Sequence, residues 1–210
     1  MARFGINPEG TLGASIPTIR NLAKTIGKDH ELALSLWKTG IHEARILASL
    51  VDDPTAVTER QMESWVKDFD SWDICDQVCS NLFGRTPFAR HKVIEWSGRE
   101  EEFVKRAGFV LVAALTVHDK KAEDSEFIAF LPMIECGSTD GRNFVKKAVN
   151  WALRQIGKRD AALNRAAIAA CESIRKKDSP SARWIAADAL RELRGEAVQR
   201  HLRVKRRIAR

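Results

Sequence analysis

The sequence predicts an all-α protein, and three observations support this. Apolar residues recur at the spacing of a helix face along nearly the whole chain. The breaks between these stretches are short and contain helix-capping residues. We find no alternating β-branched run long enough to form a strand. With 44% hydrophobic residues and only 12 Gly and 6 Pro among 210, the composition allows a large core and excludes disordered and low-complexity classes.

The expected helices follow one another in order, and we expect roughly twelve of moderate length. Three stretches show the apolar i, i+3, i+4, i+7 spacing most clearly, at residues 44–51, 75–82 and 145–156. The predicted breaks are rich in Asp, Ser, Thr, Gly and Pro, and they fall at residues 52–54, 86–87, 138–141 and 178–180.

An internal repeat suggests how these helices are arranged. The segment Phe103-Val-Lys-Arg-Ala107 recurs 41 residues later as Phe144-Val-Lys-Lys-Ala148. A weaker third copy begins at Ala182-Arg-Trp184 and leads to Leu193. Periods near 40 residues with one helix pair per unit are typical of HEAT-like solenoids, in which stacked pairs form one continuous concave surface. We therefore predict a single HEAT-like domain over residues 1–210 with a concave basic groove; the alternative is a generic helical bundle.

Positive charge is concentrated near the end of the chain. The net charge is +7, and residues 175–210 contain 12 Lys or Arg against 4 Asp or Glu. The basic helix or tail expected at residues 196–210 would attract a polyanion, most simply nucleic acid. The alternative is a solvated helix end.

Composition also bears on compartment and cofactors. Four cysteines form no disulfide framework, and the longest apolar run, Ala107–Val117, is too short to span a bilayer. The first residues lack the apolar stretch of a signal peptide. We expect a cytoplasmic monomer. Cys75 and Cys79 lie on an apolar stripe and are interpreted as buried thiols, so no metal ligand and no cofactor is predicted; His42 is expected to bond between early helices.

Candidate functional side chains lie beside the apolar stripes rather than on them. Trp72 and Asp76 are four residues apart and thus adjacent on one helix face, with Trp72 at the edge of the stripe and Asp76 further round, toward solvent or a groove. Trp151 shares a face with Lys147 and Arg154, and an indole beside cations suits contact with a base, a sugar or a cationic ligand. The alternatives are a surface carboxylate for Asp76 and core packing for the tryptophans.

The order of several segments resembles the DNA alkylation repair family, the HEAT-like alkylpurine DNA glycosylases of the AlkD type. The matching segments are Ile16–Lys24, Leu36-Trp37, Ile41–Ala48, Ser71–Asp76, Lys105–Ala107 and Phe144–Trp151. The resemblance implies Asp76 as the catalytic aspartate, Trp72 and Trp151 as active-site tryptophans and Arg106 as the active-site arginine. On the same ridge we expect DNA contacts from Lys105, Lys146, Lys147, Arg154, Arg183 and Trp184.

The chemistry of alkylated bases agrees with this assignment. Methylation of a purine ring nitrogen makes the base cationic and a good leaving group, so the glycosidic bond breaks through an oxocarbenium-like state. A fixed carboxylate stabilises that state. We therefore expect a monofunctional glycosylase acting on 7-methylguanine and 3-methyladenine in double-stranded DNA, with no membrane partner. The alternatives are a catalytically silent binder of distorted or branched DNA and, less favoured, a protein–protein scaffold.

Overall fold

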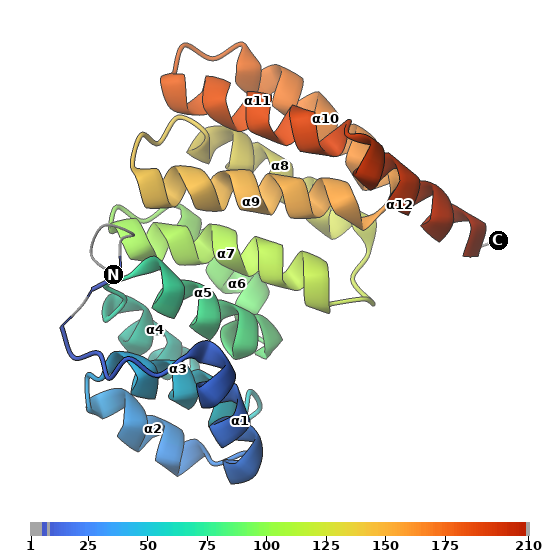
Figure 1. The fold of residues 1–210 in the computed structure, drawn as a ribbon. Helices are drawn as coiled ribbons and strands as arrows, with labels where there is room; N and C mark the ends of the chain where they lie inside the picture. The colour runs from blue at the N-terminus through green and yellow to red at the C-terminus, as the bar shows by residue number, and fades with distance from the viewer. Residues whose placement is uncertain (1–5, 8, 209–210) are drawn as a thin grey trace. The chain divides into compact units, whose positions relative to one another are not determined.

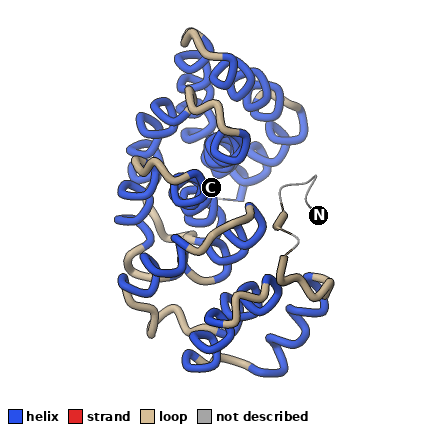
Figure 2. Tube along the Cα trace, turned by 90° about the vertical axis from the view of Figure 1, so that its left-hand side faces the viewer, coloured by secondary structure: helices blue, strands red, loops and turns tan. Residues whose placement is uncertain are grey.

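The described part of the chain is helical throughout. The computed structural model describes residues 6–7 and 9–208, with side chains up to residue 204, and over these residues Figures 1 and 2 show helices and loops without strands. The elements are α1 (Ile16–Ile26), α2 (His30–Lys38), α3 (His42–Val51), α4 (Glu59–Lys67), α5 (Trp72–Asn81), η2 (Phe83–Arg85), α6 (Ala89–Ser97), α7 (Glu102–His118), α8 (Asp124–Gly137), α9 (Asn143–Arg159), α10 (Ala161–Arg175), α11 (Pro180–Leu193) and α12 (Glu196–Ile208). The twelve α-helices and the all-α class agree with the sequence prediction.

Contacts between residues divide the chain into two compact units, residues 1–92 and 93–210. Each unit is described by itself below. Within the described residues, no helix is both long and apolar enough to cross a membrane.

Helix starts follow from local capping chemistry. Ser179 precedes α11 and accepts a hydrogen bond from the Ala182 backbone N–H, while Pro180 fills the first helical position, where no N–H is needed. Asp160 caps α10 through the backbone N–H groups of Ala162 and Leu163. The predicted breaks at residues 52–54, 86–87 and 138–141 fall between α-helices, and the fourth, at 178–180, overlaps the first residue of α11.

Unit 1 is built around a cluster of aromatic rings. Trp37 of α2 stacks on Trp65 of α4 with ring centroids 4.0 Å apart, and Phe69 and Phe83 pack beside them. Helix α3 packs against α1, α2 and α5. Because α3 is central, it fixes the position of α5 within this unit.

Unit 2 contains the predicted repeat. Helices α7, α9 and α11 lie side by side in one row, and α8 and α10 pack behind them (Figure 1). Phe103 at the start of α7 and Phe144 at the start of α9 contact each other with ring centroids 5.5 Å apart. The repeated segments therefore begin neighbouring, equivalent helices.

Two close contacts fix α7 in this row. A Cβ atom on Gly108 would lie 2.5 Å from the backbone nitrogen of Ser97, so only glycine lets α7 approach the end of α6 so closely. At the other end, the Arg159 guanidinium at the end of α9 donates hydrogen bonds to the backbone oxygens of Thr116 (2.9 Å), Asp119 (2.7 Å) and Ala122 (2.8 Å). Carbonyl groups at the end of α7 are thus satisfied by the following repeat.

The basic end of the chain forms a helix through residue 208. Val198 and Leu202 of α12 are buried, whereas Arg200 and Arg203 are exposed. The helix packs against α9, α10 and α11. Of the segment predicted as basic, residues 209–210 lie outside the described residues.

Candidate functional site

Helix α5 presents two different faces. Ile74, Cys75, Val78 and Cys79 are buried, and neither cysteine forms a disulfide, as predicted for thiols on the apolar stripe. Trp72 and Asp76 lie beside this stripe and are half-buried. Their i, i+4 spacing brings the indole and the carboxylate to adjacent positions on one side of the helix.

A histidine–aspartate pair holds the first turn of α5. His42 Nε2 at the start of α3 lies 2.8 Å from the Asp73 carboxylate, next to Trp72. This hydrogen bond raises the pKa of His42. Burial opposes ionisation of Asp73, but the hydrogen bond and the charge of His42, together with the polar groups of Ser71 and the Ile74 backbone, outweigh it and lower the pKa of Asp73. The contact confirms the prediction that His42 bonds between early helices, and it restrains the helix that contains Trp72 and Asp76.

Arg106 lies on α7 and is buried. Its Nη1 donates a 2.6 Å hydrogen bond to the backbone oxygen of Phe144. Lys147, its equivalent in the repeat, is exposed on α9. The two equivalent side chains therefore differ in environment, because the Arg106 guanidinium reaches across to the start of α9.

Trp151 lies on α9 and is half-buried, between two residues that bind α11. Asn150 donates a 2.7 Å hydrogen bond to Asp188, and Arg154 forms ion pairs with Asp188 at 3.2 Å and Glu192 at 2.8 Å. The Arg154 charge is thus largely offset within the protein. Asp188 and Glu192, which the sequence analysis did not identify, therefore hold the part of α9 around Trp151.

A spacing in the sequence could have revealed these carboxylates. Lys158 on α9 pairs with Glu192 at 2.8 Å. Asp188 and Glu192 are four residues apart on α11, and Arg154 and Lys158 show the same spacing one repeat earlier. A basic i, i+4 pair followed 34 residues later by an acidic i, i+4 pair indicates two helices that face each other.

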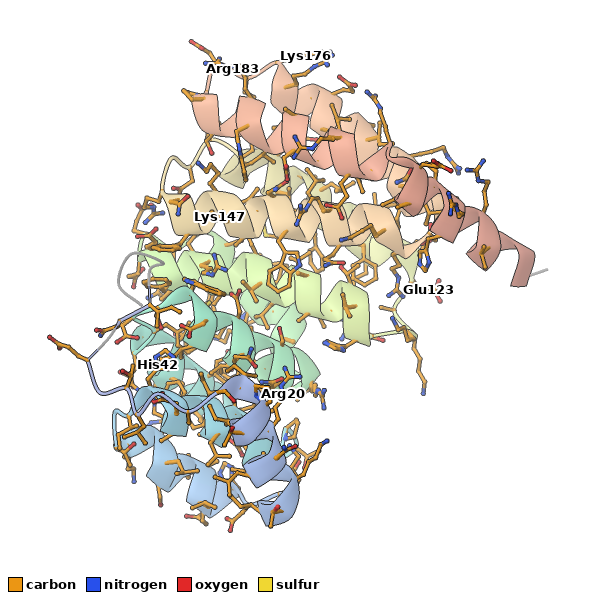
Figure 3. All side chains as sticks on the ribbon, in the orientation of Figure 1. Arg20, His42, Glu123, Lys147, Lys176 and Arg183 are labelled. Carbon is orange, nitrogen blue, oxygen red and sulfur yellow. The ribbon has the colours of Figure 1, made fainter. Side chains whose placement is uncertain are left out.

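The remaining predicted DNA contacts lie near the starts of α7, α9 and α11. The Lys146 ammonium lies over the Trp184 ring, 4.9 Å from its centroid, and Trp184 is 41% exposed. Arg183 is exposed and forms a 3.2 Å ion pair with Asp178. Lys147 and Arg183 are labelled in Figure 3 on α9 and α11.

Lys105 has an internal partner as well. Its ammonium lies 3.4 Å from Asp140. Hydrogen bonding from Arg142 lowers the pKa of Asp140 to about 2. This carboxylate is therefore ionised at neutral pH and offsets part of the cationic charge at the start of α9.

The predicted catalytic residues are divided between the two units. Trp72 and Asp76 belong to unit 1, and Arg106 and Trp151 to unit 2. The predicted DNA contacts all lie in unit 2, in the row of helices α7, α9 and α11 that also contains Arg106 and Trp151.

Comparison with known proteins identifies the family and the fold of the chain. The sequence profile of a family described as DNA alkylation repair enzyme matches residues 1–193. No curated protein matches the chain. One solved structure resembles the chain with a TM-score of 0.74 and 19% identity, covering 91% of this chain and 86% of its own. It is described as a new family of proteins related to the HEAT-like repeat DNA glycosylases with affinity for branched DNA structures. At this identity the likeness establishes the fold, and it confirms the predicted HEAT-like arrangement.

Proposed function

Since the chain belongs to the DNA alkylation repair enzyme family and has the HEAT-like fold, we propose that it is a DNA N-glycosylase. Its substrates are cationic alkylated purines such as 7-methylguanine and 3-methyladenine in duplex DNA. The observation that supports this most directly is the pairing of a half-buried carboxylate, Asp76, with an adjacent half-buried indole, Trp72, on α5. A helix face that served only for packing would present neither a carboxylate nor an indole to a ligand.

Asp76 has the central role in the proposed reaction. Alkylation leaves the purine positively charged, so the base departs without strong protonation by the enzyme. Positive charge then develops at the anomeric carbon, and the Asp76 carboxylate stabilises it electrostatically and orients the attacking water. The bond to the purine nitrogen breaks and the purine leaves as a neutral base with that electron pair, while the water oxygen bonds to the anomeric carbon and releases one proton to solvent.

The tryptophans bind the charged substrate. The faces of Trp72 and Trp151 attract the cationic base and the sugar through cation–π contact, which is strongest in a partly desolvated site. Asn150 and Arg154 keep the helix around Trp151 in place through their contacts with Asp188.

Arg106 acts on the phosphate backbone in this proposal. A guanidinium matches phosphate geometry well and cannot lose its charge at neutral pH. Its hydrogen bond to the Phe144 oxygen orients it and joins α7 to α9. Arg106 therefore combines a structural contact with a proposed DNA contact.

A second candidate function has one specific observation in its favour. The similar solved structure is described as having affinity for branched DNA structures. A catalytically silent protein that binds branched DNA would use the same cationic side chains and would not need Asp76.

Release of bases from methylated DNA tests the proposal. Double-stranded DNA treated with a methylating agent is incubated with the protein, and the freed 7-methylguanine and 3-methyladenine are quantified against spontaneous depurination of the same DNA. Release above this background supports the glycosylase. Release at the background level, together with retained DNA binding, supports the silent binder.

A further inference from the structure

Trp184 is unusual among the aromatic side chains of the described residues. The other tryptophans are buried or half-buried, whereas Trp184 is 41% exposed and is the one aromatic residue among the large hydrophobic side chains that are exposed in the described part of the chain. Its neighbours on α11, Ser181, Ala182, Ile185 and Ala186, are buried and account for the packing of that helix. The exposed indole is therefore not required to fill the core.

The surroundings of Trp184 are cationic. Lys146 places its ammonium 4.9 Å from the ring centroid, and Arg183 is the preceding residue. The nearby acid, Asp178, is fully exposed and pairs with Arg183 at 3.2 Å. Ion pairs of this exposed kind contribute little stability, so a phosphate can replace Asp178 as the partner of Arg183.

Further positive charge lies at the same edge of unit 2. Lys176, at the end of α10, and Arg183, in the first turn of α11, are both labelled along this edge in Figure 3. Lys176 is exposed. An exposed aromatic face among cations is the combination that binds unpaired nucleotides, because the base stacks on the ring while the phosphates contact the cations.

We propose that Trp184, with Lys146 and Arg183, forms a stacking platform for an unpaired base at a fork, branch or end of DNA. Bases inside an intact duplex are stacked on one another and do not reach such a platform. The platform therefore gives a preference for DNA with unpaired bases, in addition to the phosphate contacts that any duplex makes. This inference rests on the DNA binding in the proposed function and adds to it a second site, on α9 and α11.

The test compares two DNA probes with several variants. One probe is a fully paired duplex, and the other has the same length but a forked end with unpaired bases. Affinities are measured for the parent protein, Trp184→Ala, Trp184→Phe and Lys146→Ala. The control is Ile128→Ala, which shortens a side chain of similar exposure (45%) on α8 of the same unit. Thermal melting checks that each variant is folded.

We expect the parent to bind the forked probe more tightly than the duplex. Trp184→Ala should lower affinity for the forked probe about five- to a hundredfold and leave duplex affinity nearly unchanged, since stacking on one aromatic ring is lost. Trp184→Phe should retain most of the preference because a phenyl ring still stacks. Lys146→Ala should reduce binding of both probes modestly, and Ile128→Ala should change neither.

Three results would overturn the inference: no preference of the parent for the forked probe, equal losses on both probes in Trp184→Ala, or the same loss in Ile128→Ala. Base release from methylated duplex separates this inference from the proposed function. If Trp184→Ala still releases 7-methylguanine but loses the preference for the fork, both stand. If the parent releases no base but shows a preference that depends on Trp184, only the glycosylase proposal fails.

Discussion

Replacing Asp76 by Asn removes the charge on which the proposed chemistry depends and leaves the shape of the side chain nearly unchanged. The carboxylate is half-buried on α5, so water screens it only in part. At 4–6 Å from a developing positive charge, and with an effective dielectric constant of about 20, a full negative charge contributes roughly 3–4 kcal/mol. A loss of about 2.7 kcal/mol already corresponds to a hundredfold slower reaction.

We therefore expect Asp76→Asn to release 7-methylguanine at least about a hundredfold more slowly under single-turnover conditions. DNA affinity should stay the same or rise slightly, since a negative charge near phosphates is removed. Asp70→Asn provides the matched control, because it makes the same change at an exposed carboxylate in the loop before α5.

Spontaneous depurination of the same substrate sets the lower limit of the assay. If Asp76→Asn releases the base as fast as the parent, Asp76 is only a surface carboxylate and the electrostatic reasoning fails. An equal loss in Asp70→Asn would show that the effect reflects net charge rather than position.

Four further outcomes follow from the structure. Arg106→Ala should lower the melting temperature, because a buried charge-assisted hydrogen bond contributes about 1.5–3 kcal/mol. The same variant should weaken binding to intact and methylated DNA alike. Unchanged stability would contradict the contact with Phe144. Trp151→Ala should raise the activation free energy for excision of cationic bases by about 1–2 kcal/mol, measured in single-turnover assays. Circular dichroism of this variant should show normal helicity. Binding to duplex DNA should give a log–log salt slope near −4 to −5 if roughly four to six phosphates are neutralised, and a flat response would refute DNA binding altogether. Replacing His42 by Asn should lower the melting temperature most between about pH 4 and 6.5. The stabilising contribution of His42 is lost as the pH rises through its raised pKa, and that of Asp73 is lost as the pH falls through its lowered pKa.

The fold could be predicted because its signals are periodic. The recurrence of Phe103 as Phe144 identified the equivalent starts of α7 and α9, and the two rings are in contact. The Ser179-Pro180 break marked the start of α11 because the cap and the proline act locally. Such signals depend on residues close together in the sequence, and they need no knowledge of distant partners.

Side-chain environments were harder to predict, because they depend on partners a whole repeat away. Arg106 and Lys147 occupy equivalent sequence positions, yet the first is buried against the Phe144 carbonyl and the second is exposed. Arg154 was expected to contact DNA from its position beside Trp151, but Asp188 and Glu192 bind it from α11. Periodicity shows which face of a helix is buried, but it does not show which residue of the neighbouring helix a side chain contacts.

The contact between Arg159 and the end of α7 affects how the chain can be divided. Three carbonyl oxygens at and just after the end of α7 accept hydrogen bonds from a side chain about 40 residues later in the sequence. A fragment cut after α8 would retain every residue of α7 and still lose the donor to the Thr116 oxygen in its last turn. Truncating unit 2 at a repeat boundary should therefore destabilise the repeat that remains. The smallest cooperative folding unit is a pair of adjacent repeats, as expected when stability comes from contacts between neighbouring repeats. Amide hydrogen exchange in the last turn of α7 would then report on the integrity of α9.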